Sequence, residues 1–217
     1  MMPKRVAKRE PTGKQLSSAA TKLRAKPTSS IGSPSRKTSA RASSGSSAKR
    51  SSANAPSRRI PELCADFVDL LSALSDEKAR FLVIGGYAVG VHGHPRATKD
   101  LDVWIDPTPT NARRVLEALR SFGAPIRGLT EPDLVNPEVV FQVGLPPNRI
   151  DILSAIAGVD FASCWKRRER VSFSGIRTPV ISMVDLIQNK RATGRLQDLA
   201  DADALVRLDS SSGARAR

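Results

Sequence analysis

The stretch that decides the fold runs from Phe81 to Asp106 and reads FLVIGGYAVGVHGHPRATKDLDVWID. Its first four residues form a short apolar run that two glycines end, a pattern typical of a covered strand. Gly85 and Gly86 let the backbone turn sharply and approach a bulky group closely. A short helix is expected directly after this turn, so that its free amide groups face the same point. This order of elements predicts an α/β domain.

A second strand, expected over residues 100–105, carries Asp100 and Asp102. Residues two apart on a strand project to the same face, so these two carboxylates lie together. Adjacent carboxylates repel each other and are costly to ionise unless a cation sits between them. An amide turn that can cradle phosphate, facing such a pair, predicts a site for a metal-bound nucleotide.

A third acid lies on a later hairpin, with strands expected over residues 139–143 and 149–153 and a turn over 145–148. In its second strand Asp151 is surrounded by Ile and Leu. Burying a charge in an apolar strand is costly unless the charge is paired or bound to a metal. Asp151 is therefore the natural third carboxylate of the site.

The rest of the domain is expected to surround these strands with helices. The first of them shows an apolar stripe at helical spacing, formed by Leu63, Phe67, Leu70, Leu71 and Leu74. Helices are expected over residues 61–80, 111–122, 161–170, 184–193 and 196–208, strands over 171–174 and 176–180, and a loop over 124–137. Ser182 is expected to cap the helix at 184–193, and Gly194 to break or bend the chain after it.

The 217-residue chain carries a net charge of +14, and all of this charge belongs to residues 1–59. That segment holds 15 Lys and Arg but a single acid, Glu10, whereas the remainder holds 20 basic and 20 acidic residues. The segment contains no aromatic residue and is rich in Ser, Ala, Lys, Arg and Pro, so it is expected to be a disordered arm. We therefore expect an arm at 1–59, one domain at 60–208 and a frayed end at 209–217.

The basic arm has two interpretations. It can contact nucleic acid through non-specific charge, or it can be a solvated tail without a specific partner. The N-terminus lacks the apolar segment of a secretory signal, and its Arg- and Ser-rich composition is only loosely compatible with an organelle transit peptide. No apolar run is long enough to span a membrane. Cys64 and Cys164 have no metal-binding spacing, so two buried thiols in a reducing cytoplasm are expected.

Several polar residues near the glycine turn are candidates for contact with a ligand. Arg96 and Lys99 bracket the loop before the two acids, where they can meet phosphate oxygens or form an ordinary basic surface pair. His92 and His94 flank a glycine near the end of the short helix, where a role as cap or solvated helix end is favoured over metal binding.

Taken together, these residues resemble the nucleotidyltransferase superfamily, the polymerase-β-like fold, and within it the small AbiEii or minimal-nucleotidyltransferase type. The resemblance spans about residues 81–208. It rests on the glycine pair, on the patterns Arg-x-Thr-x-Asp-x-Asp and Arg-x-Asp, and on a C-terminal Lys-x4-Arg-x2-Asp-x2-Asp pattern. The residues that carry these motifs are Gly85, Gly86, Arg96, Thr98, Asp100, Asp102, Arg149, Asp151, Lys190, Arg195, Asp198 and Asp201.

The resemblance implies a mixed sheet flanked by helices and transfer of a nucleoside monophosphate from an NTP to an acceptor hydroxyl. It also implies two Mg²⁺ ions held by Asp100, Asp102 and Asp151, which would be the catalytic residues. The nucleotide would contact Gly85, Gly86, Arg96, Thr98, Lys99, Lys190 and Arg195. Some AbiEii-like proteins are toxins, which would imply a cognate antitoxin. The acceptor, whether RNA, protein or a small molecule, cannot be read from these residues.

Two other functions compete with this interpretation. One is an inactive nucleotidyltransferase-like module that binds nucleic acid through its basic arm, and the other is a purely structural α/β domain. The presence of all three acids favours activity, because neither alternative needs them. For the C-terminal pattern, ion pairing at the start of a helix competes with a role in phosphate binding.

Overall fold

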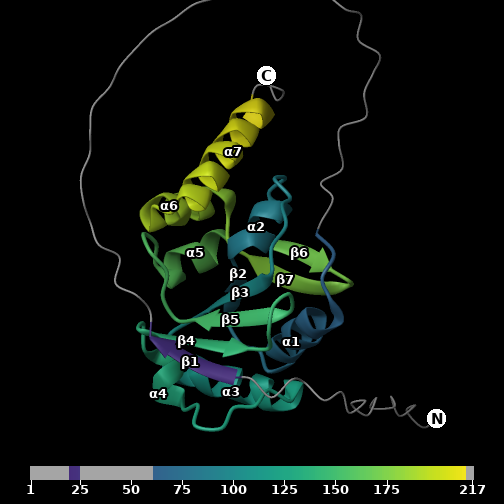
Figure 1. Ribbon diagram of the computed structural model, residues 1–217, viewed down its shortest axis with the longest axis vertical. Coiled ribbons are helices and arrows are strands. Elements are labelled where there is room, and N and C mark those ends of the chain that lie inside the picture. The colour runs from purple at the N-terminus through teal and green to yellow at the C-terminus, as the bar shows by residue number, and fades with distance from the viewer. Residues whose placement is uncertain (1–19, 25–60, 214–217) are drawn as a thin grey trace, which may run out of the picture.

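The computed structural model describes residues 20–24 and 61–213, which form a mixed sheet with helices packed on both faces (Figure 1). The strands are β1 (Ala20–Arg24), β2 (Phe81–Val83), β3 (Asp100–Ile105), β4 (Val139–Val143), β5 (Arg149–Leu153), β6 (Glu169–Phe173) and β7 (Ile176–Val180). The helices are α1 (Ala65–Asp76), α2 (Gly85–Val91), α3 (Pro109–Phe122), α4 (Glu131–Val135), α5 (Phe161–Arg167), α6 (Met183–Thr193) and α7 (Leu196–Gly213). The predicted fold class, an α/β domain with a mixed sheet flanked by helices, is confirmed.

The strand order is β1-β4-β5-β3-β2-β7-β6, which places β3 at the centre of the sheet. Within the described segments β3 pairs with β5, and β2 with β7, in parallel, while the other neighbouring strands are antiparallel. The stretch that opened the sequence analysis therefore forms the middle of the domain. Within this stretch, β2 pairs antiparallel with β3 in the register Phe81↔Ile105 to Val83↔Val103.

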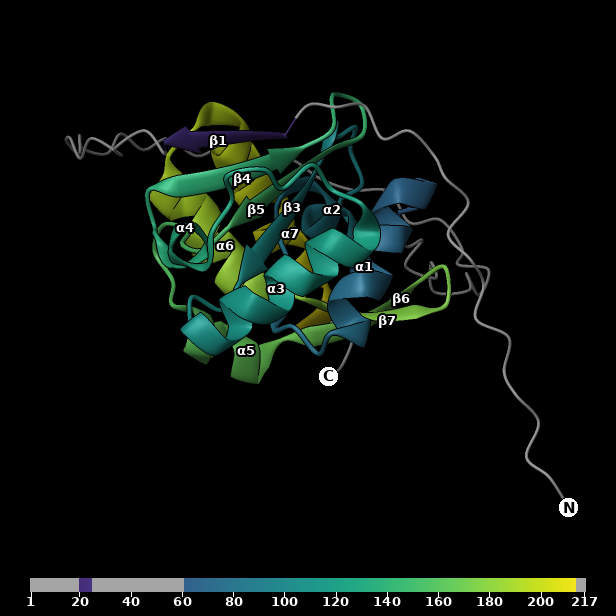
Figure 2. The ribbon, with the colours of Figure 1, turned by 90° about the horizontal axis from the view of Figure 1, so that it is seen from below.

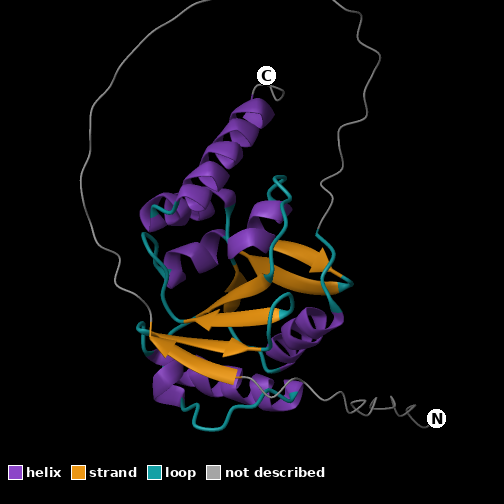
Figure 3. Cartoon of the chain, in the orientation of Figure 1, coloured by secondary structure: helices purple, strands orange, loops and turns teal. Residues whose placement is uncertain are grey.

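The helices form two layers, one on each face of the sheet (Figure 3). On one side lie α1, α3 and α4, which are in front when the molecule is seen from below (Figure 2). On the other side lie α2, α5, α6 and α7, and α7 extends away from the sheet toward the C-terminus (Figure 1). All five residues of the predicted apolar stripe are buried, but the helix is shorter than the expected 61–80, because α1 covers only Ala65–Asp76 and Leu63 lies before it.

A five-residue segment of the N-terminal arm differs from the expected disorder. Ala20–Arg24 forms β1, which pairs antiparallel with β4 from Ala20↔Val143 to Arg24↔Val139. An edge strand such as β4 presents a row of free backbone donors and acceptors, and an extended segment of any composition can satisfy them. Composition therefore missed this strand, and the other residues of the predicted arm lie outside the described part of the chain.

Other boundaries also differ from the prediction. The expected loop at 124–137 contains the short helix α4, where Thr130 and Asp133 form a capping box. Strand β6 begins at Glu169 instead of residue 171, and α7 continues to Gly213 instead of ending at residue 208. Gly194 has φ +70°, a left-handed conformation that ends α6, so the two C-terminal helices are separate.

Two smaller expectations are also corrected. His92 takes the C-cap position of α2, as one of the two interpretations expected, but it is buried, with Nε2 2.8 Å from the carbonyl oxygen of Ile181, so it is not solvated. Both cysteines are free thiols, but only Cys164 is buried and Cys64 is partly exposed. Among the helices that the structure describes, none combines the length and apolar character that a bilayer crossing requires.

One buried amide ties α3 to the central strands. The Asn111 side chain accepts a hydrogen bond from the Arg80 backbone N–H at 2.7 Å and donates to the carbonyl oxygens of Arg80 and Asp106, at 2.9 and 3.0 Å. Arg80 precedes β2 and Asp106 follows β3. A single side chain therefore fixes the start of one central strand and the end of the other relative to α3.

We predict that Asn111→Ala lowers the free energy of unfolding by about 1–3 kcal/mol, because it leaves backbone groups beside β2 and β3 without their partners. The measurement is chemical denaturation followed by circular dichroism. Arg113→Ala, an exposed change two residues further along α3, is the control and should leave the midpoint nearly unchanged. Equal midpoints for the two variants would contradict this role of Asn111.

Candidate active site

Three aspartates lie on the same face of the two central parallel strands. Asp102 on β3 is directly paired with Asp151 on β5, and Asp100 is paired with Arg149. Because residues two apart on a strand share a face, and paired residues on adjacent strands point the same way, all four side chains project together. The structure therefore brings the three predicted acids together, and their catalytic role remains a prediction.

Arg149 is the counter-ion of this cluster. Its Nε lies 2.9 Å from Asp151 Oδ1, and its Nη2 donates to Asp151 Oδ2 at 3.1 Å and to a carboxylate oxygen of Asp100. The sequence analysis used Arg149 only as part of a motif and gave it no place in the site. The parallel register, which places it opposite Asp100, was the missing signal, because strand pairing cannot be read from a single strand.

One guanidinium does not neutralise three carboxylates. Burial, followed by repulsion from Asp151 and Asp100, raises the pKa of Asp102 to about 7. Burial also raises the pKa of Asp151, although Arg149 and a 3.0 Å hydrogen bond donated by Gln142 oppose this rise. The positive charge of Arg149 is therefore smaller than the negative charge of the three carboxylates, and the pKa of Asp102 rises to about 7 as a result of burial and of this repulsion.

The two glycines after β2 make room for side chains of the site. A Cβ on Gly85, which has φ +63°, would lie 1.8 Å from Asp102 Oδ2, and a Cβ on Gly86 would lie 2.6 Å from Thr98 Oγ1. Any larger residue would displace Asp102 or Thr98. The predicted close approach is present, and the groups that approach are a carboxylate and a hydroxyl of the protein itself.

A second charged cluster joins the loop before β3 to the two C-terminal helices. Arg96 donates from Nε and Nη2 to the two carboxylate oxygens of Asp201, both at 2.9 Å. Lys190 Nζ lies 2.5 Å from Asp198 Oδ1 and 3.2 Å from Asp201 Oδ2. Asp201 is fully buried. Although Gly194 separates the helices, α6 and α7 still bring Lys190 and Asp201 into contact.

The two remaining predicted basic residues differ in position. The Arg195 side chain is 80% exposed at the start of α7, where its Nε lies 3.9 Å from Asp198 Oδ2. Lys99 is exposed, lies just before β3 and does not line the cleft. The structure therefore brings Arg195 to the site and leaves Lys99 outside it.

The aspartates and the basic cluster line one open cleft of about 540 Å³. Every predicted site residue except Lys99 contributes to its walls. The lining residues are Gly85, Gly86, Arg96, Thr98, Asp100, Asp102, Val140, Gln142, Arg149, Asp151, Leu153, Lys190, Arg195, Gln197 and Asp198. A cleft that is acidic on the sheet side and basic on the helix side can accept an anion together with its counter-cation.

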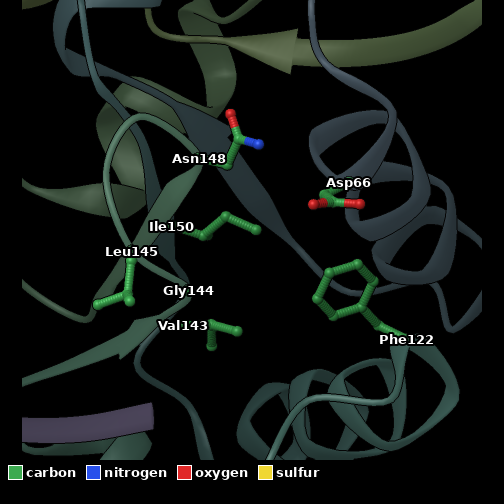
Figure 4. Close-up of a pocket in the computed structure, with 7 residues that line it drawn as sticks. All are labelled: Asp66, Phe122, Val143, Gly144, Leu145, Asn148 and Ile150. Atoms are coloured by element: carbon green, nitrogen blue, oxygen red, sulfur yellow. The ribbon is translucent and has the colours of Figure 1, made fainter. Parts of the chain in front are cut away.

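A smaller cavity of about 150 Å³ lies between the β4–β5 hairpin and helices α1 and α3 (Figure 4). Asp66 is the one charged residue in its lining, which otherwise consists of apolar side chains, a glycine and Asn148. It therefore lacks the clustered charges of the larger cleft.

The donor set of the cleft suits a hard divalent cation, since carboxylate oxygens are its preferred ligands. Within residues 20–24 and 61–213, however, no group of three or more His, Cys, Asp or Glu side chains is arranged so as to hold a metal ion. The guanidinium of Arg149 contacts two of the three carboxylates.

No family model matches the chain, and no curated protein matches it. Among solved structures it is similar to the solution structure of the antibiotic-resistance factor ANT(2'')-Ia, with 13% sequence identity and a TM-score of 0.43. The match covers 69% of this chain and 90% of that chain. A similarity at this level identifies neither a substrate nor a reaction.

The electrostatics of the cleft predict a pH-dependent stability in the absence of divalent ions. The pKa of Asp102 rises from 3.8 to about 7 on folding. The contribution of the Asp102 carboxyl to the free energy of unfolding is therefore fully present below about pH 4 and is lost as the pH rises to about 7. Asp102→Asn removes this loss, so the variant should become more stable than the wild type by on the order of 1–3 kcal/mol above pH 7.

The measurement is urea unfolding in EDTA between pH 4 and pH 8. Asp203→Asn, an exposed change on α7, is the matched control and should show no such trend. A stability difference between Asp102→Asn and the wild type that does not change with pH would contradict the raised pKa of Asp102.

Proposed function

We propose that this domain transfers a nucleoside monophosphate from an NTP to an acceptor hydroxyl. The observation that carries the proposal is the convergence of Asp100, Asp102 and Asp151 on one face of an open cleft that Arg195, mostly exposed, also lines. The resemblance of the sequence motifs to nucleotidyltransferases supports the same reaction. A structural domain would have no need to hold three carboxylates together at the cost of repulsion.

In the proposed reaction the acceptor oxygen attacks the α-phosphorus of the NTP, and the bond from that phosphorus to the bridging oxygen breaks. Pyrophosphate leaves with the electron pair of that bond. The proton of the acceptor hydroxyl passes to a carboxylate, for which Asp151 is suited because burial raises its pKa above the usual range. The protein mainly positions the reactants and neutralises charge that spreads over the phosphoryl group.

Asp100, Asp102 and Asp151 would hold the Mg²⁺ ions that the resemblance implies. When bound, these ions would neutralise the phosphate oxygens and the leaving group. The three acids orient one another through the β3–β5 register. Arg149 would have to give up its contacts with Asp100 and Asp151, and its partly exposed side chain can turn into the cleft.

On the basic wall, Arg195 is the residue best able to meet the triphosphate, because its side chain is mostly exposed and only weakly paired. Arg96 and Lys190 line the same wall, but Asp198 and Asp201 already neutralise them. We therefore assign them mainly to shaping the wall. Thr98 lies close to Gly86 and also lines the cleft, and its hydroxyl donates to the carbonyl oxygen of Asp100 at 3.3 Å.

The acceptor belongs to one of the three classes that the sequence leaves open, namely RNA, protein or a small molecule. A toxin activity with a cognate antitoxin, and a cytoplasmic location, remain predictions of the same interpretation. Nucleic-acid binding without catalysis is the second candidate. The ion pairs of Arg149 with Asp100 and Asp151 favour it, because they partly neutralise the cluster from within the protein.

A transfer assay tests the proposed activity. Incubation with each α-labelled NTP, Mg²⁺ and pools of RNA, protein and small hydroxyl compounds should label an acceptor. Asp100→Asn and Asp102→Asn should each lower the rate by at least about a hundredfold, since each removes a carboxylate that would hold the cations neutralising the phosphate, and Asp203→Asn should not change it. Absence of transfer with every NTP and pool would favour the binding module.

The position of Arg149 gives a separate prediction that does not depend on turnover. Arg149→Gln removes the internal cation, so the metal-free variant should be less stable and should bind Mn²⁺ several-fold more tightly than the wild type. Thermal unfolding with and without Mn²⁺ and calorimetric titration measure the two effects. Weaker Mn²⁺ binding by the variant would show that Arg149 supports the metal site and does not compete with it.

A further inference from the structure

A cluster of arginines lies well away from the cleft, near the edge of the sheet formed by β7 and β6 (Figure 1). It lines a cavity of about 190 Å³ whose walls include Trp165, Arg168, Arg170 and Arg177, and none of the lining residues is acidic. We call these four residues the arginine pocket. Neither the sequence motifs nor the proposed reaction accounts for it.

Aromatic rings hold the positive charges of this region together. The guanidinium carbon of Arg168 lies 3.9 Å from the centre of the Trp165 ring, and that of Arg80 lies 4.9 Å from it. Phe161 stacks on Trp165 with their centroids 5.8 Å apart. Cation–π contacts of this kind favour a guanidinium on an indole face, so Trp165 gathers charges that would otherwise repel each other.

The strand register adds two more guanidiniums. Arg170 is paired with Pro179, and Ser172, two residues after it on β6, is paired with Arg177. Arg170 and Arg177 therefore project to the same face of the β6–β7 hairpin, and both are exposed. Glu169, which precedes Arg170, projects to the opposite face of β6, where its carboxylate lies 3.6 Å from His92.

The charges of the pocket are not balanced. Arg80, beside it, is paired with Asp106 at 2.7 Å. The Nε of Arg168 is buried and has no hydrogen-bond partner. Burial, and then repulsion from Arg170 and Arg80, lowers the pKa of Arg168. A group of like charges with an unused donor is favourable for binding an anion, because the anion relieves the repulsion and satisfies the donor.

We propose that the arginine pocket binds the phosphate backbone of a single-stranded nucleic acid. Guanidinium groups supply paired donors for phosphate oxygens, and guanidinium planes held on an aromatic ring also offer surfaces on which bases stack. The chain adds a +14 segment at residues 1–59, which gives the same molecule a general attraction to polyanions. This inference does not depend on the proposed transfer reaction.

Binding of a fluorescent oligouridylate to the full-length protein tests the site by fluorescence anisotropy at several salt concentrations. The double variant Arg170→Gln/Arg177→Gln should bind about tenfold more weakly at physiological salt, and the slope of log K against log salt should fall by about 1.4. The control Arg127→Gln/Arg207→Gln removes two exposed arginines that do not line the pocket and the same total charge.

A local signal separates the pocket from the basic arm. The chain has two tryptophans, and Trp104 is buried, so a ligand in the pocket should quench the fluorescence of Trp165. The quenching should disappear in Trp165→Phe and weaken in the Arg170/Arg177 double variant. Asp102→Asn should retain both the quenching and the affinity, because the pocket lies apart from the cleft.

Three results would overturn the proposal. The first is an equal loss of affinity in the double variant and in its control, which would assign binding to total charge. The second is oligouridylate binding without any change in Trp165 fluorescence. The third is equal quenching by polyglutamate or by inorganic phosphate alone, which would show that the pocket accepts any polyanion or a free phosphate instead of a nucleic-acid strand.

Discussion

The parallel pairing of β3 with β5 sets the register Asp102↔Asp151 and Asp100↔Arg149. Other residues of the cleft compensate for the charge and the bulk of the acids that this register brings together. Three carboxylates on one face repel each other, and the buried ones among them lose solvation on folding. Arg149, supplied by the same register, removes part of this cost. Gly85 avoids a steric clash, because only a glycine leaves space for the Asp102 carboxylate against the turn.

The opposite wall of the cleft follows a different principle. Arg96 and Lys190 are compensated by Asp201 and Asp198, so this cluster is nearly neutral and mostly buried. Buried ion pairs of this kind contribute little net stability, because desolvation offsets the attraction, but breaking one partner is costly. The cluster therefore acts as a geometric constraint that fixes α6 and α7 against the loop before β3. Arg195, at the rim, keeps the conformational freedom that Arg96 and Lys190 lose.

The sequence predicted the central elements because their signals are local. The alternation of Asp100 and Asp102 on a strand, the glycine turn and the apolar surroundings of Asp151 each lie within a few residues. The position of Arg149 depended on the pairing of two strands that are about fifty residues apart, and no local pattern reports that pairing. Strand β1 was missed for a similar reason, because its partner β4 supplies the hydrogen bonds that its own composition does not predict.

Charge in the folded domain is separated in space, although residues 60–217 hold equal numbers of basic and acidic residues. Carboxylates gather where the β3–β5 register brings them together, and several arginines gather around Trp165 near the β6–β7 edge of the sheet. Net charge would describe such a domain as neutral and unlikely to attract polyanions. A ligand responds instead to the local field, which falls off within about 8–10 Å in physiological salt. The cleft and the arginine pocket therefore present distinct electrostatic environments to their ligands, and each has to be judged by its own residues.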